Sequence, residues 1–232
     1  MNSYTLKLGK QSEIDLRAVL AIEALEEGDY KRLAESWRDS GAAPQDYKAR
    51  IIFANRAPTL TRLDLNEIKL RMPHCVEVQP GRLVPMAAVR LVRPVTDEQR
   101  TQMATAYPEQ AEAIAAKETR FEYGVPDAAG DPVIKHYPVS IKAMREARAN
   151  LVNIGGERYI FAANITDPEK VRKLTDDELS KLREAYTLAD NQGIQIPTVH
   201  GPLIGTVPPH SIRQRAEGTP TRKNDEPKRQ PG

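Results

Sequence analysis

The chain has 232 residues, of which 40% are hydrophobic and 28% charged, and its formal net charge is +2. This composition predicts a folded globular protein, and the near balance of charge excludes a uniform electrostatic attraction to nucleic acid or membranes. Cys75 is the only cysteine, which excludes an intramolecular disulfide and a cysteine-rich zinc site.

The sequence gives no signal for export or membrane insertion. Its N-terminus lacks the apolar core of a signal peptide. No apolar run approaches the roughly 18 residues needed to span a bilayer. We therefore expect a cytoplasmic protein, or a virion component assembled in the cytoplasm, with no membrane partner.

The N-terminal region predicts a helical hairpin over residues 12–41. A short edge strand is expected before it, at residues 3–8. Apolar residues then recur at helical spacing over residues 14–25. Gly28 interrupts this pattern, and a second short helix is expected over residues 30–37.

The middle of the chain predicts antiparallel β-hairpins with helices inserted between them. Alternating apolar residues and turn signals define the strands of these hairpins. The expected strands are residues 76–78, 83–92, 119–125 and 132–139. A capping box of Thr96 and Gln99 opens one inserted helix, and Ser140 caps another. Residues 60–72 fit either a bulged strand or a helix.

The C-terminal part predicts a strand at residues 158–162, a helix and a tail. Thr175 and Glu178 form a capping box that opens the helix. After Ile212 the sequence contains no large apolar residue, so too little surface can be buried to offset the entropy of ordering. We expect residues 208–232 to be a disordered, mildly basic, proline-rich tail.

These elements predict an α+β fold, because helices and hairpins alternate without a regular βαβ rhythm. We expect a single body over residues 1–207, with a sub-boundary near residue 57. No internal repeat is visible in the sequence.

No motif in the sequence predicts catalysis or the binding of a metal or cofactor. The four histidines are far apart, and no glycine-rich phosphate loop or serine-nucleophile elbow occurs. His74 precedes Cys75 directly, but neighbouring residues on a strand point to opposite faces, so this adjacency does not form a nucleophile and base pair. We expect Cys75 to be a small packing residue.

Three groups of residues could bind nucleic acid. Aromatic side chains on two predicted strands are flanked by arginines, which suits base stacking and phosphate binding, although the same rings could form the core. These strand residues are Arg120, Phe121, Tyr123, Arg158, Tyr159 and Phe161. The helix that Ser140 opens carries Lys142, Arg145 and Arg148. The basic residues of the predicted tail are Arg213, Arg215, Arg222, Lys223, Lys228 and Arg229.

We expect a non-enzymatic assembly or interaction protein that belongs to a larger complex, such as a phage or mobile-element particle. Such a protein would bind protein partners or associate with itself. The alternative is an accessory or regulatory protein that binds single-stranded nucleic acid through the strand residues. An enzyme without a recognisable motif is the third hypothesis.

Overall fold

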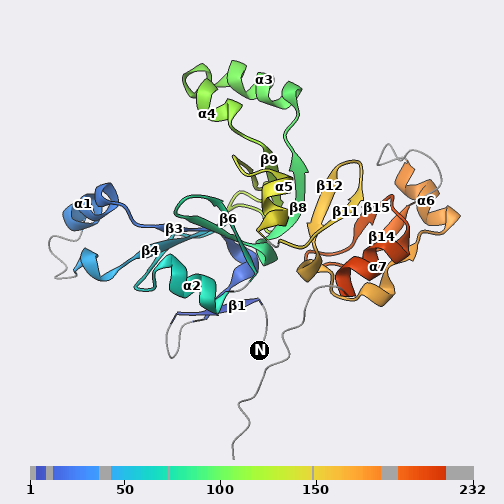
Figure 1. Ribbon diagram of the computed structural model, residues 1–232, viewed down its shortest axis with the longest axis horizontal. Coiled ribbons are helices and arrows are strands. Elements are labelled where there is room, and N and C mark those ends of the chain that lie inside the picture. The colour runs from blue at the N-terminus through green and yellow to red at the C-terminus, as the bar shows by residue number, and fades with distance from the viewer. Residues whose placement is uncertain are drawn as a thin grey trace, which may run out of the picture.

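The computed structural model describes residues 4–8, 13–36, 43–72, 74–147, 149–183 and 193–217. The fold is mixed α+β, and the paired strands in the described ranges are antiparallel. Three lobes extend from a shared centre (Figure 1). Among the residues described, no helix is long and apolar enough to cross a bilayer.

A similar order of elements occurs three times along the chain: a hairpin, a 3-10 turn, a strand, a helix, two strands and a last helix. The second unit has an additional helix before its two strands, and the third has an additional 3-10 turn, Pro168–Lys170, before its first single strand. The first unit comprises β1 (Thr5–Lys7), β2 (Glu13–Asp15), β3 (Val19–Ala24), α1 (Glu27–Ser36), β4 (Ala49–Phe53), β5 (Thr59–Thr61) and α2 (Leu65–Arg71). The second comprises β6 (Cys75–Gln79), β7 (Arg82–Pro85), β8 (Val89–Pro94), α3 (Asp97–Ala106), α4 (Ala111–Ala115), β9 (Thr119–Tyr123), β10 (Ile134–Tyr137) and α5 (Ile141–Glu146). The third comprises β11 (Leu151–Gly155), β12 (Arg158–Phe161), β13 (Arg172–Lys173), α6 (Asp176–Arg183), β14 (Ile194–Ile196), β15 (Leu203–Gly205) and α7 (Pro209–Glu217).

The sheets follow the same repeat. The first has the strand order β5-β4-β3-β7-β6 and the second β10-β9-β8-β12-β11. In each, the hairpin that opens the next unit completes the sheet of the unit before it. A smaller sheet, β13-β14-β15, belongs to the third unit, and β1 and β2 form a separate pair.

Each unit has its own hydrophobic core, and its last helix contributes a fully buried side chain to that core. These side chains are Ile68 on α2, Met144 on α5 and Ile212 on α7. Because they occupy the same place in the three units, the repeat is a repeat of packing as well as of topology.

Hydrogen bonds between units fix the units to one another. The 3-10 turns Leu16–Ala18, Met86–Ala88 and Ala162–Asn164 follow the opening hairpins of the respective units. From the third turn, the buried Asn164 amide donates to the carbonyls of Met86 and Val89 at 2.9 and 2.8 Å. The Tyr123 hydroxyl of the second unit donates to the Leu20 carbonyl of the first at 2.8 Å.

The predicted N-terminal helical hairpin is wrong. The first helix is α1, and residues 13–24 form β2, a 3-10 turn and β3. Strand β3 contacts core on both faces, with Val19, Ala21 and Ile22 all buried. A strand buried on both faces has a continuous apolar run, which periodicity cannot distinguish from a buried helix.

The expected hairpins and inserted helices are present, but the expected strand over residues 83–92 is two strands, β7 and β8, separated by the 3-10 turn Met86–Ala88. Strands β6 and β7 pair, as do β9 and β10. Thr96 and Gln99 form the predicted capping box of α3, with N···O distances of 3.2 Å in both directions. The ambiguous residues 60–72 contain the end of β5 and all of α2.

The C-terminal segment is ordered for longer than predicted. Residues 209–217 form α7, because Ile212 packs in the third core and Arg213 donates to the Val171 carbonyl at 2.7 Å. The disordered tail expected from residue 208 therefore does not begin there. Residues 218–232 of the predicted tail lie outside the described ranges.

Candidate anion-binding face on the middle sheet

The aromatic residues predicted to stack bases lie mainly in the core of the second unit. Phe121, Tyr123 and Phe161 are buried, and the first of these is 0% exposed. Tyr159 is half-buried and packs against the same core. Buried rings cannot present a face to a base, so the structural basis expected for stacking is absent at these three positions.

The predicted arginines lie on the opposite face of the same sheet. Side chains alternate along a strand, so Arg120 and Glu122 point away from the core that contains Phe121. Tyr159 pairs with the core-facing Val92, which places Arg158 on the Arg120 face as well. The sequence prediction combined arginines and aromatics that a single ligand cannot reach together.

Four basic side chains form a row across four strands of the second sheet. Arg120 on β9 is the register partner of Arg93 on β8 and of His136 on β10. Tyr159 pairs with Val92, and continuing this antiparallel register by one residue places Arg158 opposite Arg93. The row is therefore Arg158, Arg93, Arg120 and His136, which we call the arginine row.

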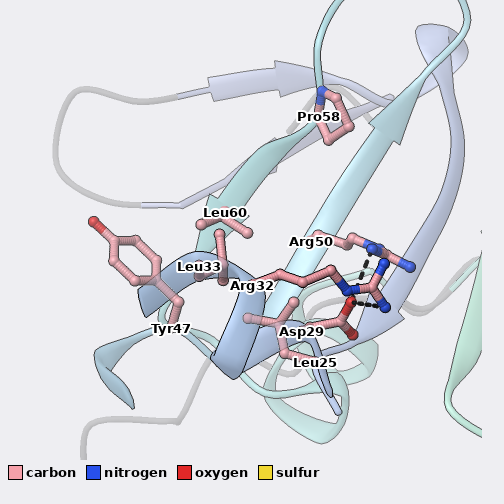
Figure 2. A pocket seen from close by; sticks show the side chains of 8 residues that line it. All are labelled: Leu25, Asp29, Arg32, Leu33, Tyr47, Arg50, Pro58 and Leu60. Carbon is pink, nitrogen blue, oxygen red and sulfur yellow. Dashed lines mark hydrogen bonds and ion pairs between the residues drawn. The ribbon is translucent and has the colours of Figure 1, made fainter. Parts of the chain in front are cut away.

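Two carboxylates, Glu23 in the row and Asp29 on α1, face the two arginines of the equivalent row in the first sheet. There Glu23 on β3 stands between Arg50 on β4 and Arg82 on β7, which are its register partners. Glu23 is buried, and its carboxylate pairs with both arginines, at 2.6 Å for Arg50. Asp29 on α1 accepts a second hydrogen bond from Arg50 at 3.2 Å and also approaches Arg32 (Figure 2).

Arg93 takes the place of Glu23 in the second sheet, and Gln99 takes the place of Asp29. Three arginines in the row thus face one carboxylate, Glu122, which leaves an excess of two positive charges. One Glu122 oxygen lies 3.4 Å from Arg93 Nε and 3.3 Å from an Arg120 terminal nitrogen. An arginine in the place of a glutamate makes the middle row more positive than the first row by two charges.

The third unit resembles the first in charge balance. Arg172 on β13 pairs with Gln195 on β14. Its guanidinium makes a bidentate ion pair with Glu178 at 2.8 and 2.6 Å. The excess positive charge is thus a property of the middle row among the three.

Burial and neighbouring positive charge both lower pKa values in the row. Burial, followed by repulsion from Arg93, lowers the pKa of the Arg158 guanidinium, and Glu122 opposes this only partly. Burial and then the charges of Arg120 and Lys117 lower the pKa of His136. In both groups burial is the larger cause and the neighbouring cations add to it in the same direction.

The row also has unused hydrogen-bond donors. The buried Nε–H groups of Arg93 and Arg120 make no hydrogen bond, as is also true of Arg82 in the first row, although Arg93 Nε lies 3.4 Å from Glu122; the side chain of Arg93 is 42% exposed. In the described ranges no carboxylate forms an ion pair with Arg158, whose Nε donates to the Gly155 carbonyl at 3.0 Å. Guanidinium groups in such a setting suit a planar or tetrahedral oxyanion.

The other predicted binding residues do not join this row. Lys142 and Arg145 lie on α5, over the opposite face of the sheet, and Arg145 is placed 5.3 Å from the Tyr159 ring centroid. Arg213 is half-buried and donates to backbone carbonyls, whereas Arg215 is exposed. The predicted residues outside the described ranges are Arg148, Arg222, Lys223, Lys228 and Arg229.

Cys75 behaves as the sequence predicts, as a packing residue. It begins β6, packs at the edge of the first core, and burial raises the pKa of its thiol to about 11. A thiol with this pKa is protonated at neutral pH and is a poor nucleophile. Within the described part of the chain, no group of three or more His, Cys, Asp or Glu side chains could hold a metal ion.

Sequence reasoning missed Arg93 and His136, although a signal for Arg93 was present. The segment Val95-Thr96-Asp97 matches Leu174-Thr175-Asp176 at the start of an equivalent helix. Aligning the units on these helix starts would have placed Glu23, Arg93 and Arg172 in one column. His136 joins the row only through the pairing of β9 and β10.

The sequence matches no protein-family model, and no curated protein or solved structure is significantly similar to it.

Proposed function

We propose that this protein is a non-enzymatic interaction protein of a larger assembly, and that its arginine row binds an anionic group of a partner. The supporting observation is the replacement of Glu23 by Arg93 at equivalent positions of two sheets with the same topology. Within a fold, three clustered guanidinium groups with one carboxylate destabilise the sheet unless an anion compensates them. A cluster of like charges that destabilises the sheet is most simply explained by a ligand that carries the missing negative charge.

The proposal is tested by measuring the binding of inorganic phosphate and sulfate to the full chain. Isothermal titration calorimetry against chloride at matched ionic strength should detect binding to the wild type. Arg158→Gln removes one charge from the row and should weaken binding at least 10-fold, because each hydrogen bond to a charged group contributes about 1.5–3 kcal/mol.

Lys142→Gln is the matched control, since it removes the same charge from the opposite face of the sheet. Lys142 is exposed, and its ion pair with Glu146 is 3.9 Å long, so this change should alter neither folding nor anion binding. Equal losses in both variants would show only a general effect of net charge. Equal losses, or no binding by the wild type, would overturn the proposal.

A further inference from the structure

We infer that the partner anion is single-stranded nucleic acid, with phosphates on the arginine row and a base against Tyr107. This inference rests on the proposed function, because it names the partner of the same row. It depends on a second feature beside the row, a pocket between the α3–α4 segment and strand β10. The volume of this pocket is ≈ 240 Å³.

The pocket and the arginine row are continuous through His136. His136 is the register partner of Arg120 and also lines the pocket. The residues that line the pocket are Met103, Tyr107, Gln110, Ile114, Lys117, Ile134, Lys135 and His136. A polynucleotide chain that follows the row, at right angles to the strands, therefore enters the pocket beside β10.

The pocket offers an aromatic face at the surface. Tyr107 is 56% exposed and Ile134 is 37% exposed, and both are large apolar side chains. Exposed tyrosines bind bases by stacking, without a requirement for a particular sequence. Tyr107 is thus placed to do what the sequence predicted for Tyr123 and Tyr159, which pack in or against the core.

The charges around this pocket also favour a phosphate backbone. Lys117 and Lys135 line it, and no carboxylate is among its lining residues. The corresponding pocket of the first unit contains Asp29 beside Arg32 and Arg50 and has Leu60 in the place of His136, so a carboxylate there partly neutralises the arginines (Figure 2). The pocket of the middle unit combines two lysines, no lining carboxylate and an exposed aromatic ring.

The length of the arginine row suits a short segment of single-stranded nucleic acid. Adjacent strands lie about 4.8 Å apart, so the row from Arg158 to His136 extends over roughly 14 Å. That length accommodates a few nucleotides, which agrees with the small number of charges. Binding that neutralises about three phosphates should weaken roughly 20-fold when salt rises from 50 to 200 mM, because the slope for single strands is about −0.7 per phosphate.

The experiment is fluorescence anisotropy of the full chain with a labelled 12-nucleotide oligothymidine and its oligouridine counterpart. Arg93→Glu should abolish binding of both oligonucleotides. Tyr107→Ala should weaken oligonucleotide binding about 5- to 100-fold, as loss of base stacking does, and leave the affinity for inorganic phosphate unchanged. Leu70→Ala, which removes an 85% exposed side chain from α2, is the control and should bind as the wild type does.

The outcomes separate this inference from the proposed function. Phosphate binding without oligonucleotide binding would overturn the nucleic-acid inference and leave the anion site intact. Binding of a labelled acidic peptide in its place, lost in Arg93→Glu, would identify the partner as an acidic protein segment and also overturn it. If neither phosphate nor oligonucleotide binds, both proposals are wrong. Circular dichroism of each variant shows whether it is folded.

Discussion

Arg93→Glu should stabilise the protein while it destroys the anion site. The change gives the middle row the arrangement that the first sheet already has, with a carboxylate between two arginines. In the wild type, Arg93 stands beside Arg120 and opposite Arg158, and such like-charge pairs destabilise a sheet by about 0.2–1 kcal/mol each. Replacing them with opposite charges reverses the sign of both contributions.

Glu122 reduces the stability that Arg93→Glu is expected to gain. The substitution removes the attraction between Arg93 and Glu122, whose atoms are 3.4 Å apart, and places two carboxylates near each other. The side chain of Arg93 is 42% exposed, so each pair is worth less than 1 kcal/mol. We expect a net gain of about 1 kcal/mol, which corresponds to a rise of about 2–4 °C in Tm for a chain of this size.

The assay is thermal unfolding followed by circular dichroism at 20 mM and 1 M NaCl. The difference in Tm should be largest at low salt and shrink at 1 M, where the Debye length is only about 3 Å. A lower Tm for the variant at low salt would refute the reasoning, as would a gain that does not depend on salt. Glu23→Gln in the first unit is the reciprocal control and should lower the Tm, because it leaves Arg50 and Arg82 without their shared carboxylate.

Three further changes test packing and titration. Met144→Ala should reduce the free energy of unfolding in urea by about 2–5 kcal/mol, because this side chain is 0% exposed, and an unchanged midpoint would contradict its place in the core. Gly205→Ala should destabilise by about 1–3 kcal/mol, since a Cβ there would lie 2.8 Å from the Ile154 carbonyl oxygen; wild-type stability would show that the strands can separate. The lowered pKa of His136 means that the unfolded chain binds more protons at acid pH, so stability should fall as the pH drops below about 6.5 and be unaffected above it. Urea unfolding at pH 7.5 and 5.5 checks this, with His136→Gln expected to reduce the difference, and NMR titration should show that bound phosphate raises the pKa of His136.

Local signals in the sequence predicted local structure well. The capping boxes at Thr96 and Thr175 open helices as expected, since cap hydrogen bonds join residues only three apart. The hairpins β6–β7 and β9–β10 also formed where alternating residues and turns predicted them. These features depend on neighbours in the chain and are visible without knowledge of the fold.

Features that depend on pairing between distant strands were not predictable in the same way. Because β3 is buried on both faces, its sequence has a continuous apolar run that was predicted to be a helix. The burial of Phe121 and Phe161 depends on α5, which covers one face of the sheet. The repeat was hidden because the three units share topology and packing while few residues are identical. Ile68, Met144 and Ile212 occupy equivalent helix positions in three separate cores. Different apolar residues of similar size fill these positions, so the repeat is not visible as sequence identity.

The sequence by itself determined the α+β composition, the helix starts and the presence of arginines next to strand aromatics. It could not determine which of these residues share a face, because alternation sends neighbours on a strand to opposite sides of a sheet. Only the tertiary structure brought Arg93 between Arg120 and Arg158 and placed His136 at the end of their row. The physical reason is that register between strands far apart in the chain sets which charges meet, and that register is decided by the packing of the whole sheet.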